Sequence, residues 1–297
     1  MDIKLRSQEE ISFAKKLHKE ISFAKDMYIY SYKENLPDPV LFKFLDFTGA
    51  FLSIENSNAR FTYACDFNDM QEGIIPPFLK NVIPDIVKYS LVYCLTQSYD
   101  NVLMWTHYAD SWNGAVIGFS IKDKKKFRRF EPTKVTYYSD VSEKENAIDN
   151  FIRSQINSDT QKPSEHSLIA EILKFKNSIW EYEKEIRLIR YPHQCLQKKI
   201  ITSLDMVKFI NSKERDIARF FSFEELGLEI SAIYLGTRLL SKIFSIVDQL
   251  YISEQLSKEQ IDYLKFYISI LKIPNVKIYC CSSSTDGASV EKKDIFG

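Results

Sequence analysis

Apolar side chains near the N-terminus recur at helical intervals. They define one face of a helix predicted over residues 1–35, at Ile11, Ala14, Leu17, Ile21, Ala24 and Tyr28. The string EISFAK occurs twice in this segment, ten residues apart. The duplication either extends a helix that packs on the protein or provides a helix that binds a partner or a second copy of the chain. Pro37 and Pro39 end the pattern, so residues 1–38 are expected to form an N-terminal helical extension.

Further along the chain, short apolar or alternating runs predict strands at 40–44, 59–63, 90–95, 115–121, 134–138, 184–191, 230–236 and 276–281. Amphipathic stretches predict helices at 46–56, 140–165 (ending in a loose connection), 168–179, 204–221 and 241–271. The composition does not change along these elements. We therefore expect one α+β domain over 39–281, in which helices flank a central, largely antiparallel, split sheet, followed by a flexible tail over 282–297.

Composition narrows the class of protein. The chain has 297 residues, of which 45% are hydrophobic and 27% charged, and its formal net charge is zero. A neutral chain has no global field that would attract it to nucleic acid or an acidic membrane. It contains only 8 Gly and no G-x-G-x-x-G or G-x-x-x-x-G-K-[ST] loop. Five cysteines without framework spacing, a charged N-terminus and no long apolar run predict a cytoplasmic protein that does not enter a membrane.

Two polar segments each allow two interpretations. The loop from Ala64 to Glu72 carries Asp66, Asn68 and Asp69, which either hold a metal or ligand or simply form a turn. The run KDKKKFRR over residues 122–129 is either a solvated turn after a strand or a patch that contacts phosphate.

Aromatic and acidic residues supply the candidate chemistry. Trp105, His107 and Trp112 crowd the sequence before the strand at 115–121, where they either line a site or pack in the core. If residues 184–191 form a strand, its period of two puts Glu183, Glu185 and Arg187 on one face. Two carboxylates beside an arginine form either an ion-pair ladder or part of a functional site.

Several separated segments of the chain form an ordered set. They are Leu41-Phe42-Lys43-Phe44, Phe67-Asn68-Asp69, the run from Asn101 to Ala109 followed by Gly114 and Ile117-Gly118-Phe119, and the run from Trp180 to Ile189. Together they cover roughly residues 40–190, with weaker matches at 233–236 and 276–279. This set resembles the bacterial domain-of-unknown-function family 2971.

The order of the segments is similar, more remotely, to the layout of ADP-ribosyltransferase domains, and most of all to toxins that modify nucleic-acid bases. The resemblance implies that Glu185, with Glu183, is catalytic and that NAD is the substrate. It implies that Lys43, which stands where that superfamily has His or Arg, holds the NAD ribose, and that Tyr108 or Trp105 stacks on nicotinamide. The residues that it implies for NAD binding are Lys43, Phe44, Asn68, Asp69, Trp105, His107, Tyr108 and Arg187.

The expected function is an NAD-using ADP-ribosyltransferase-like enzyme, as in a bacterial toxin or a phage-defence effector. It would transfer ADP-ribose to a nucleic-acid or protein acceptor, or hydrolyse NAD. Breaking the nicotinamide–ribose bond passes through an oxocarbenium-like state, which a carboxylate beside the ribose can stabilise. The same carboxylate could instead accept the acceptor's proton.

Two alternatives stay open. The first is a metal-dependent nuclease, with candidate ligands at Asp66, Asp69, Glu183 and Glu185. The second is a non-catalytic binding or sensor module, in which Trp105, His107 and Trp112 pack structurally.

Overall fold

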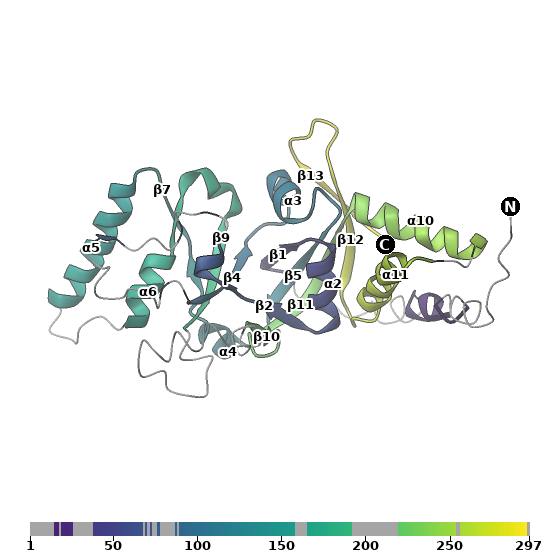
Figure 1. Cartoon of the computed structure of the whole chain (residues 1–297), viewed down its shortest axis with the longest axis horizontal. Helices are drawn as coiled ribbons and strands as arrows, with labels where there is room; N and C mark the ends of the chain where they lie inside the picture. Colours follow the sequence, from purple (N-terminus) through teal and green to yellow (C-terminus); the bar gives the residue numbers. More distant parts are fainter. Residues whose placement is uncertain are drawn as a thin grey trace. The chain divides into compact units, whose positions relative to one another are not determined.

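The computed structural model describes residues 15–17, 19–25, 38–67, 69, 72, 76–77, 87, 89–157, 165–191, 219–253 and 256–295. The chain forms two compact units. Unit 1 comprises Met1–Ser57, Tyr99–Ser120 and Ile230–Gly297, and unit 2 comprises Asn58–Ser98 and Ile121–Glu229. Figure 1 shows both units, coloured along the sequence.

The strands of unit 1 follow the order β13-β12-β11-β5-β1. Their bounds are Leu41–Leu45 (β1), Ala115–Ile121 (β5), Leu228–Gly236 (β11), Lys277–Ser283 (β12) and Val290–Asp294 (β13). β1 pairs antiparallel with β5, whereas β11 and β12 pair in parallel. The parallel pair needs a crossover connection, which α10 (Thr237–Ser253) and α11 (Lys258–Leu271) provide.

Local sequence signals fix the ends of the helices in unit 1. Asp46 caps α2 (Phe47–Glu55) by accepting a hydrogen bond of 2.6 Å from the backbone N–H of Gly49. A capping box between Ser257 and Gln260 starts α11. The rings of Phe47 and Tyr263 stack 4.0 Å apart, so α2 packs on α11. Figure 1 shows α10 and α11 next to each other in green and yellow.

Two glycines allow close backbone approach in unit 1. A Cβ on Gly114 would lie 2.1 Å from the carbonyl oxygen of Leu45, and one on Gly236 would lie 2.2 Å from that of Trp112. The N–H of Gly236 donates to the carbonyl of Gly114 over 3.0 Å. Any larger side chain would push these backbones apart. Gly114, directly before β5, therefore serves packing.

Unit 2 contains the remaining strands, which form three groups. They are β2 (Asn58–Arg60), β3 (Thr62–Tyr63), β4 (Leu91–Thr96), β6 (Thr133–Lys134), β7 (Thr136–Tyr138), β8 (Phe175–Asn177), β9 (Glu185–Arg190) and β10 (Phe220–Ser222). β9 lies between β4 and β6, antiparallel to both, and β3 pairs with β4. β7 and β8 form a parallel pair, and β10 pairs antiparallel with β2.

Unit 2 has two 3₁₀ turns, η1 (Ala64–Asp66) and η3 (Ser178–Glu183). Its α-helices are α4 (Lys124–Arg128), α5 (Val141–Asn157) and α6 (Glu165–Leu173). The buried core of this unit joins α5, α6 and the strands β4, β7, β8 and β9. It includes Ile148, Ile172, Phe175 and Ile189, which are 0–3% exposed. This burial holds β8 and η3 close to β9.

The structure confirms the predicted class, with mixed α and β content and a mostly antiparallel sheet flanked by helices. The predicted strand at 59–63 divides into β2 and β3, because the N–H of Phe61 bonds to Arg219. The one at 134–138 divides into β6 and β7, because the N–H of Val135 bonds to Glu185. In both cases one alternating run pairs with two different neighbours.

Other boundaries also differ from the prediction. The helix predicted over 168–179 ends at Leu173, and its last part forms β8 and η3. The basic run forms the short helix α4 rather than a turn, because the Asp123 carboxylate caps the N–H groups of Lys125 and Lys126. Residues 290–294, in the segment expected to be a flexible tail, pair with β12 as β13. Most of the helix predicted over 204–221 lies outside the described residues.

Candidate functional site

The predicted acidic strand is β9, and its neighbours hold its polar side chains inside unit 2. In the register of β4 and β9, Glu185 lies opposite Thr96 and Arg187 lies opposite Cys94. Lys184 adopts a left-handed conformation (φ 45°) between η3 and β9. Glu183 and Glu185 lie on either side of this turn, and both carboxylates reach Lys176 of β8.

Arg187 is the centre of a buried group of charges. Its Nε donates to Glu185 Oε1 over 2.9 Å and its Nη2 donates to Glu185 Oε2 over 3.0 Å, a two-point contact. Nη2 also donates to Glu72, and Nη1 donates to the carbonyl oxygen of Leu173 over 2.5 Å. The residue is 0% exposed. These hydrogen bonds therefore join the guanidinium to other groups of the protein, away from solvent.

Lys176 is the second cation and contacts three carboxylates. Its Nζ lies 2.5 Å from Glu183 Oε2, 3.1 Å from Glu72 Oε1 and 3.3 Å from Glu185 Oε2. We call Glu72, Lys176, Glu183, Glu185 and Arg187 the charge cluster. Each of the five is at most 9% exposed. Burying ions costs several kcal/mol each unless they are paired, so these contacts offset a large desolvation cost.

The cluster has one more carboxylate than cations. Lys144, a further buried cation, lies close enough to the cluster to interact with Glu72, and also with Asp69 and Glu145 outside it. Burial acts to raise the pKa of Glu185, but Arg187 and Lys176 lower it to about 2. Burial acts to lower the pKa of Lys176, yet Glu185, Glu72 and Glu183 raise it above its ordinary value. Both groups are thus held in their charged forms at neutral pH.

Aromatic side chains surround the charge cluster. The Trp180 ring lies 5.2 Å from Lys176 Nζ, and the Phe67 ring lies 5.3 Å from Arg187 Cζ. The Tyr137 hydroxyl accepts a hydrogen bond of 2.9 Å from the N–H of Glu185. Burial, together with the nearby carboxylates, raises the pKa values of Tyr137 and Tyr182 to about 12. The phenols are therefore neutral and can act as hydrogen-bond donors.

The structure brings together the three residues predicted on one face, Glu183, Glu185 and Arg187. Glu185 and Arg187 form an ion pair along β9, as the ladder interpretation predicted. Asp69 lies close enough to Tyr138 and Lys144 to affect their pKa values. Asn68 lies outside the described residues, so its predicted contact with NAD stays a prediction.

The other candidate residues belong to unit 1. Trp105, on α3 (Val102–Tyr108), is 0% exposed and stacks on Trp112 with centroids 4.9 Å apart. Its Nε1 donates to the carbonyl oxygen of Tyr99 over 2.8 Å, and its ring meets Phe44 edge-on at 5.5 Å. These contacts make Trp105 part of the core of unit 1.

Three further residues of unit 1 that are predicted to bind NAD are more accessible to solvent than Trp105. His107 is exposed in the last turn of α3, and Tyr108, its neighbour, is half-buried. Lys43 is half-buried on β1, opposite Ile117. Lys43 and Tyr108 belong to unit 1 and Glu185 belongs to unit 2, so their joint use in NAD binding stays a prediction.

Sequence reasoning missed Lys176 as a site residue and noted Glu72 only as part of a polar loop. The helix predicted over 168–179 includes Lys176, whereas in the structure Lys176 lies on β8 and therefore has different neighbours. The local signal was a lysine directly after the apolar residue Phe175, although Lys174 on the other side of Phe175 gives the same signal. A charge at such a position needs a partner when it is buried.

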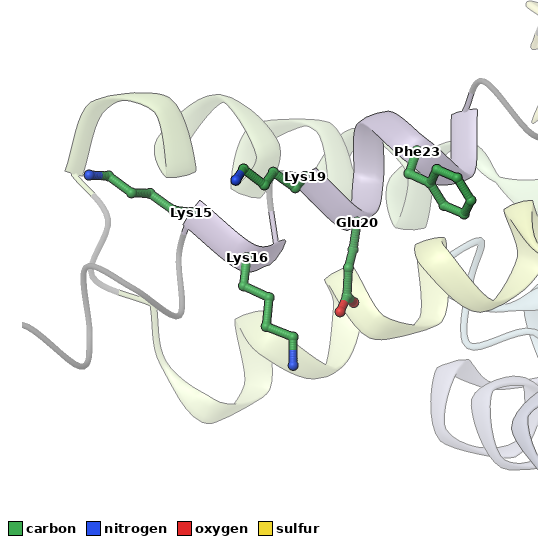
Figure 2. Close-up of a pocket in the computed structure, with 5 residues that line it drawn as sticks. All are labelled: Lys15, Lys16, Lys19, Glu20 and Phe23. Atoms are coloured by element: carbon green, nitrogen blue, oxygen red, sulfur yellow. The ribbon is translucent and has the colours of Figure 1, made fainter.

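Unit 1 also contains a hollow on the helical segment at 15–25, lined by Lys15, Lys16, Lys19, Glu20 and Phe23, with a volume of about 530 Å³. Figure 2 shows Lys16 and Glu20 pointing to the same side, one turn apart. The opposite face of the segment is buried through Leu17, Ile21 and Ala24, as the helical pattern predicted. Three lysines against one glutamate make the hollow basic. Its use by a partner or by a second copy stays a prediction.

Among the described residues, no group of three or more His, Cys, Asp or Glu side chains is arranged to hold a metal ion. Asp66, a candidate ligand, instead lies 3.7 Å from Arg219. No helix in the described part of the chain is long and apolar enough to cross a membrane.

The fold and the charge cluster define an α+β protein that buries five lysine, arginine and glutamate side chains beside half-buried aromatic residues. Residues 104–188 match the model of a family described as "Protein of unknown function (DUF2971)", and this match supports the membership of the chain in that family. The matched segment includes Trp105, Lys176, Glu185 and Arg187. Comparison with curated proteins and with solved structures found no significant match.

Proposed function

We propose that the protein is an ADP-ribosyltransferase-like enzyme that uses NAD, with Glu185 as its central catalytic residue. The observation that carries the proposal is the charge cluster, in which Arg187 and Lys176 keep Glu185 ionised on β9. Breaking the nicotinamide–ribose bond develops positive charge on the ribose. A fixed carboxylate in a buried environment favours such a state.

The pKa of Glu185 decides between its two possible roles. A general base works best when its pKa lies near the working pH. With a pKa of about 2, lowered by Arg187 and Lys176 against the effect of burial, Glu185 is a weak base at pH 7. We therefore assign it the electrostatic role, in which the carboxylate stabilises the developing positive charge on the ribose.

The reaction can be written with its atoms in balance. The bond between the nicotinamide nitrogen and the ribose C1 breaks, and its electron pair stays on nicotinamide, which leaves as a neutral molecule. An oxygen or nitrogen of water or of the acceptor forms the new bond to C1 and releases one proton to the solvent. Lys176 and Arg187 position the carboxylates, and half-buried Tyr137 supplies a neutral hydroxyl beside them.

The test is nicotinamide release from labelled NAD by the wild-type protein and by Glu185→Gln. We expect the variant to lose at least about 100-fold in rate, because removing a single well-placed electrostatic group typically has an effect of that order. The matched control is Glu224→Gln, which changes a glutamate of unit 2 with an 87% exposed side chain. Circular dichroism checks that both variants fold. A wild-type protein that releases no nicotinamide with any protein or nucleic-acid acceptor would refute the proposal.

A second candidate function is a non-catalytic binding module. The observation that favours it is the full burial of Trp105, whose ring is already stacked on Trp112 and whose N–H is already bonded to Tyr99. A ring with such contacts stabilises the fold without touching a ligand. Loss of folding in Trp105→Ala, together with the absence of NAD turnover in the wild type, would favour this candidate.

A further inference from the structure

Unit 2 exposes a group of apolar and aromatic side chains beside the charge cluster. Ile179 of η3 is 71% exposed and Val141, at the start of α5, is 53% exposed. A hydrogen bond of 3.3 Å between the hydroxyls of Ser139 and Ser178 joins the two segments that carry them. Trp180 and Tyr182, also on η3, are half-buried, with ring centroids 6.0 Å apart. We call Val141, Ile179, Trp180 and Tyr182 the η3 surface.

Such a group differs from the isolated apolar residues found on any protein surface. Single exposed apolar side chains need no explanation, whereas several together mark an interaction surface. Tyr and Trp are also enriched at interfaces, because they combine a large apolar area with a polar group. The η3 surface has both properties, and η3 leads directly into Glu185.

The charges around the η3 surface indicate what binds there. Within two positions of its residues along the chain, Asp140, Glu143 and Glu181 are exposed acids and Lys184 is the one exposed cation. Two of these acids are held in place at the start of α5. Asp140 accepts a hydrogen bond of 2.8 Å from the N–H of Ser142, and Glu143 accepts one of 3.0 Å from the N–H of Ser139.

We propose that the η3 surface binds a basic segment of a protein, in which lysine or arginine residues are interspersed with apolar ones. In the proposed function, on which this inference rests, that segment belongs to the acceptor of ADP-ribose. Apolar side chains of the segment pack on Ile179 and Val141, and its cations face Glu181 and Asp140. Nucleic acid is the less suitable acceptor, because its phosphates would meet the same carboxylates.

The experiment measures binding without NAD, so its result does not depend on whether the protein turns NAD over. The probe is a fluorescent synthetic peptide in which lysine and arginine alternate with leucine, followed by anisotropy. The comparison probes are the same peptide with glutamate in place of the cations and a labelled single-stranded DNA oligonucleotide. We expect the basic peptide to bind at least about tenfold more tightly than either, and binding to weaken as salt is added.

Two variants and two matched controls locate the binding. Ile179→Ser and Glu181→Lys should each weaken peptide binding at least about tenfold. Phe220→Ser changes another exposed apolar residue of unit 2, 48% exposed, and Glu224→Lys changes another exposed acid, so both should bind like the wild type. The variants change exposed side chains, and circular dichroism confirms their folding.

Three outcomes would overturn the inference. The basic peptide could bind no better than the acidic one, the DNA could bind more tightly than the peptide, or the controls could lose as much affinity as the variants. Peptide binding at the η3 surface without any NAD turnover would instead support this surface and refute the proposed function. NAD turnover without peptide binding would refute only the inference.

Discussion

The two compact units of this protein both bury aromatic rings, but the buried Lys, Arg and Glu side chains that the structure describes all lie in unit 2. In unit 1 the large buried groups are neutral aromatics, such as Trp105 stacked on Trp112, and the indole N–H satisfies a backbone carbonyl. In unit 2 the charge cluster is also buried, and its cations Arg187 and Lys176 are shared among three glutamates. The segment that matches the family model contributes to both regions.

This difference separates what stabilises a fold from what a function could require. Burying aromatic rings is favourable in itself and needs no further purpose. Buried ion pairs are weak evidence for stability, since well-packed apolar residues often replace them without loss. Clusters of groups with strongly shifted pKa values occur preferentially at functional sites. Unit 2 is therefore the better candidate for the part of the molecule that holds a functional site.

The largest effect is expected from Arg187→Ala. Removal of this guanidinium leaves Glu72 and Glu185 buried without their main partner, which should destabilise unit 2 by about 3–5 kcal/mol. Hydrogen exchange of β4 and β9, compared with β5 in unit 1, measures the loss in each unit separately. The control is Arg153→Ala, which removes a surface pair with side chains 71% and 42% exposed and should cost no more than about 0.5 kcal/mol. Equal losses in both variants would contradict the comparison.

Acid should destabilise unit 2 through Glu185. Its pKa in the folded state, about 2, lies below the ordinary value of 4.5, because Arg187 and Lys176 outweigh the effect of burial. The stabilisation is therefore fully present above pH 4.5 and is lost as the pH falls from there toward 2; the difference between the two pKa values corresponds to about 3 kcal/mol. Urea unfolding at a series of pH values, with exchange at β9 as the readout, measures it. Glu185→Gln should flatten this dependence, and an unchanged profile would show that Glu185 is not its source.

A smaller effect is expected from Trp105→Phe in unit 1. The change shortens a fully buried side chain and leaves the carbonyl of Tyr99 without its donor, at a cost of about 2 kcal/mol. Hydrogen exchange of the backbone amides in β5 and α3 measures this loss of stability. Leu103→Ala, on the same helix but 47% exposed, should change stability by no more than about 0.5 kcal/mol. Normal folding of Trp105→Phe with lost NAD turnover would instead assign Trp105 a direct part in the reaction.

Much of the architecture could be predicted from local sequence patterns. The strand at 115–121, the helix predicted over 46–56 and the shared face of Glu185 and Arg187 follow from periodicity, which acts over a few residues. The prediction was wrong where one run pairs with two neighbours, as at 134–138, and where a helical pattern stops early, as at 173. In those places hydrogen bonds to distant backbone determine the local structure.

Local patterns of residues predict the α+β class, the positions of most strands and the acidic strand that carries Glu185. Long-range packing is what places Lys176 and Glu72 in the charge cluster and Trp105 in a core. Glu72 and Arg187 are 115 residues apart in the sequence, and no periodicity connects them. The partner of a buried charge depends on which segments pack together, and that choice depends on the free energy of the whole fold.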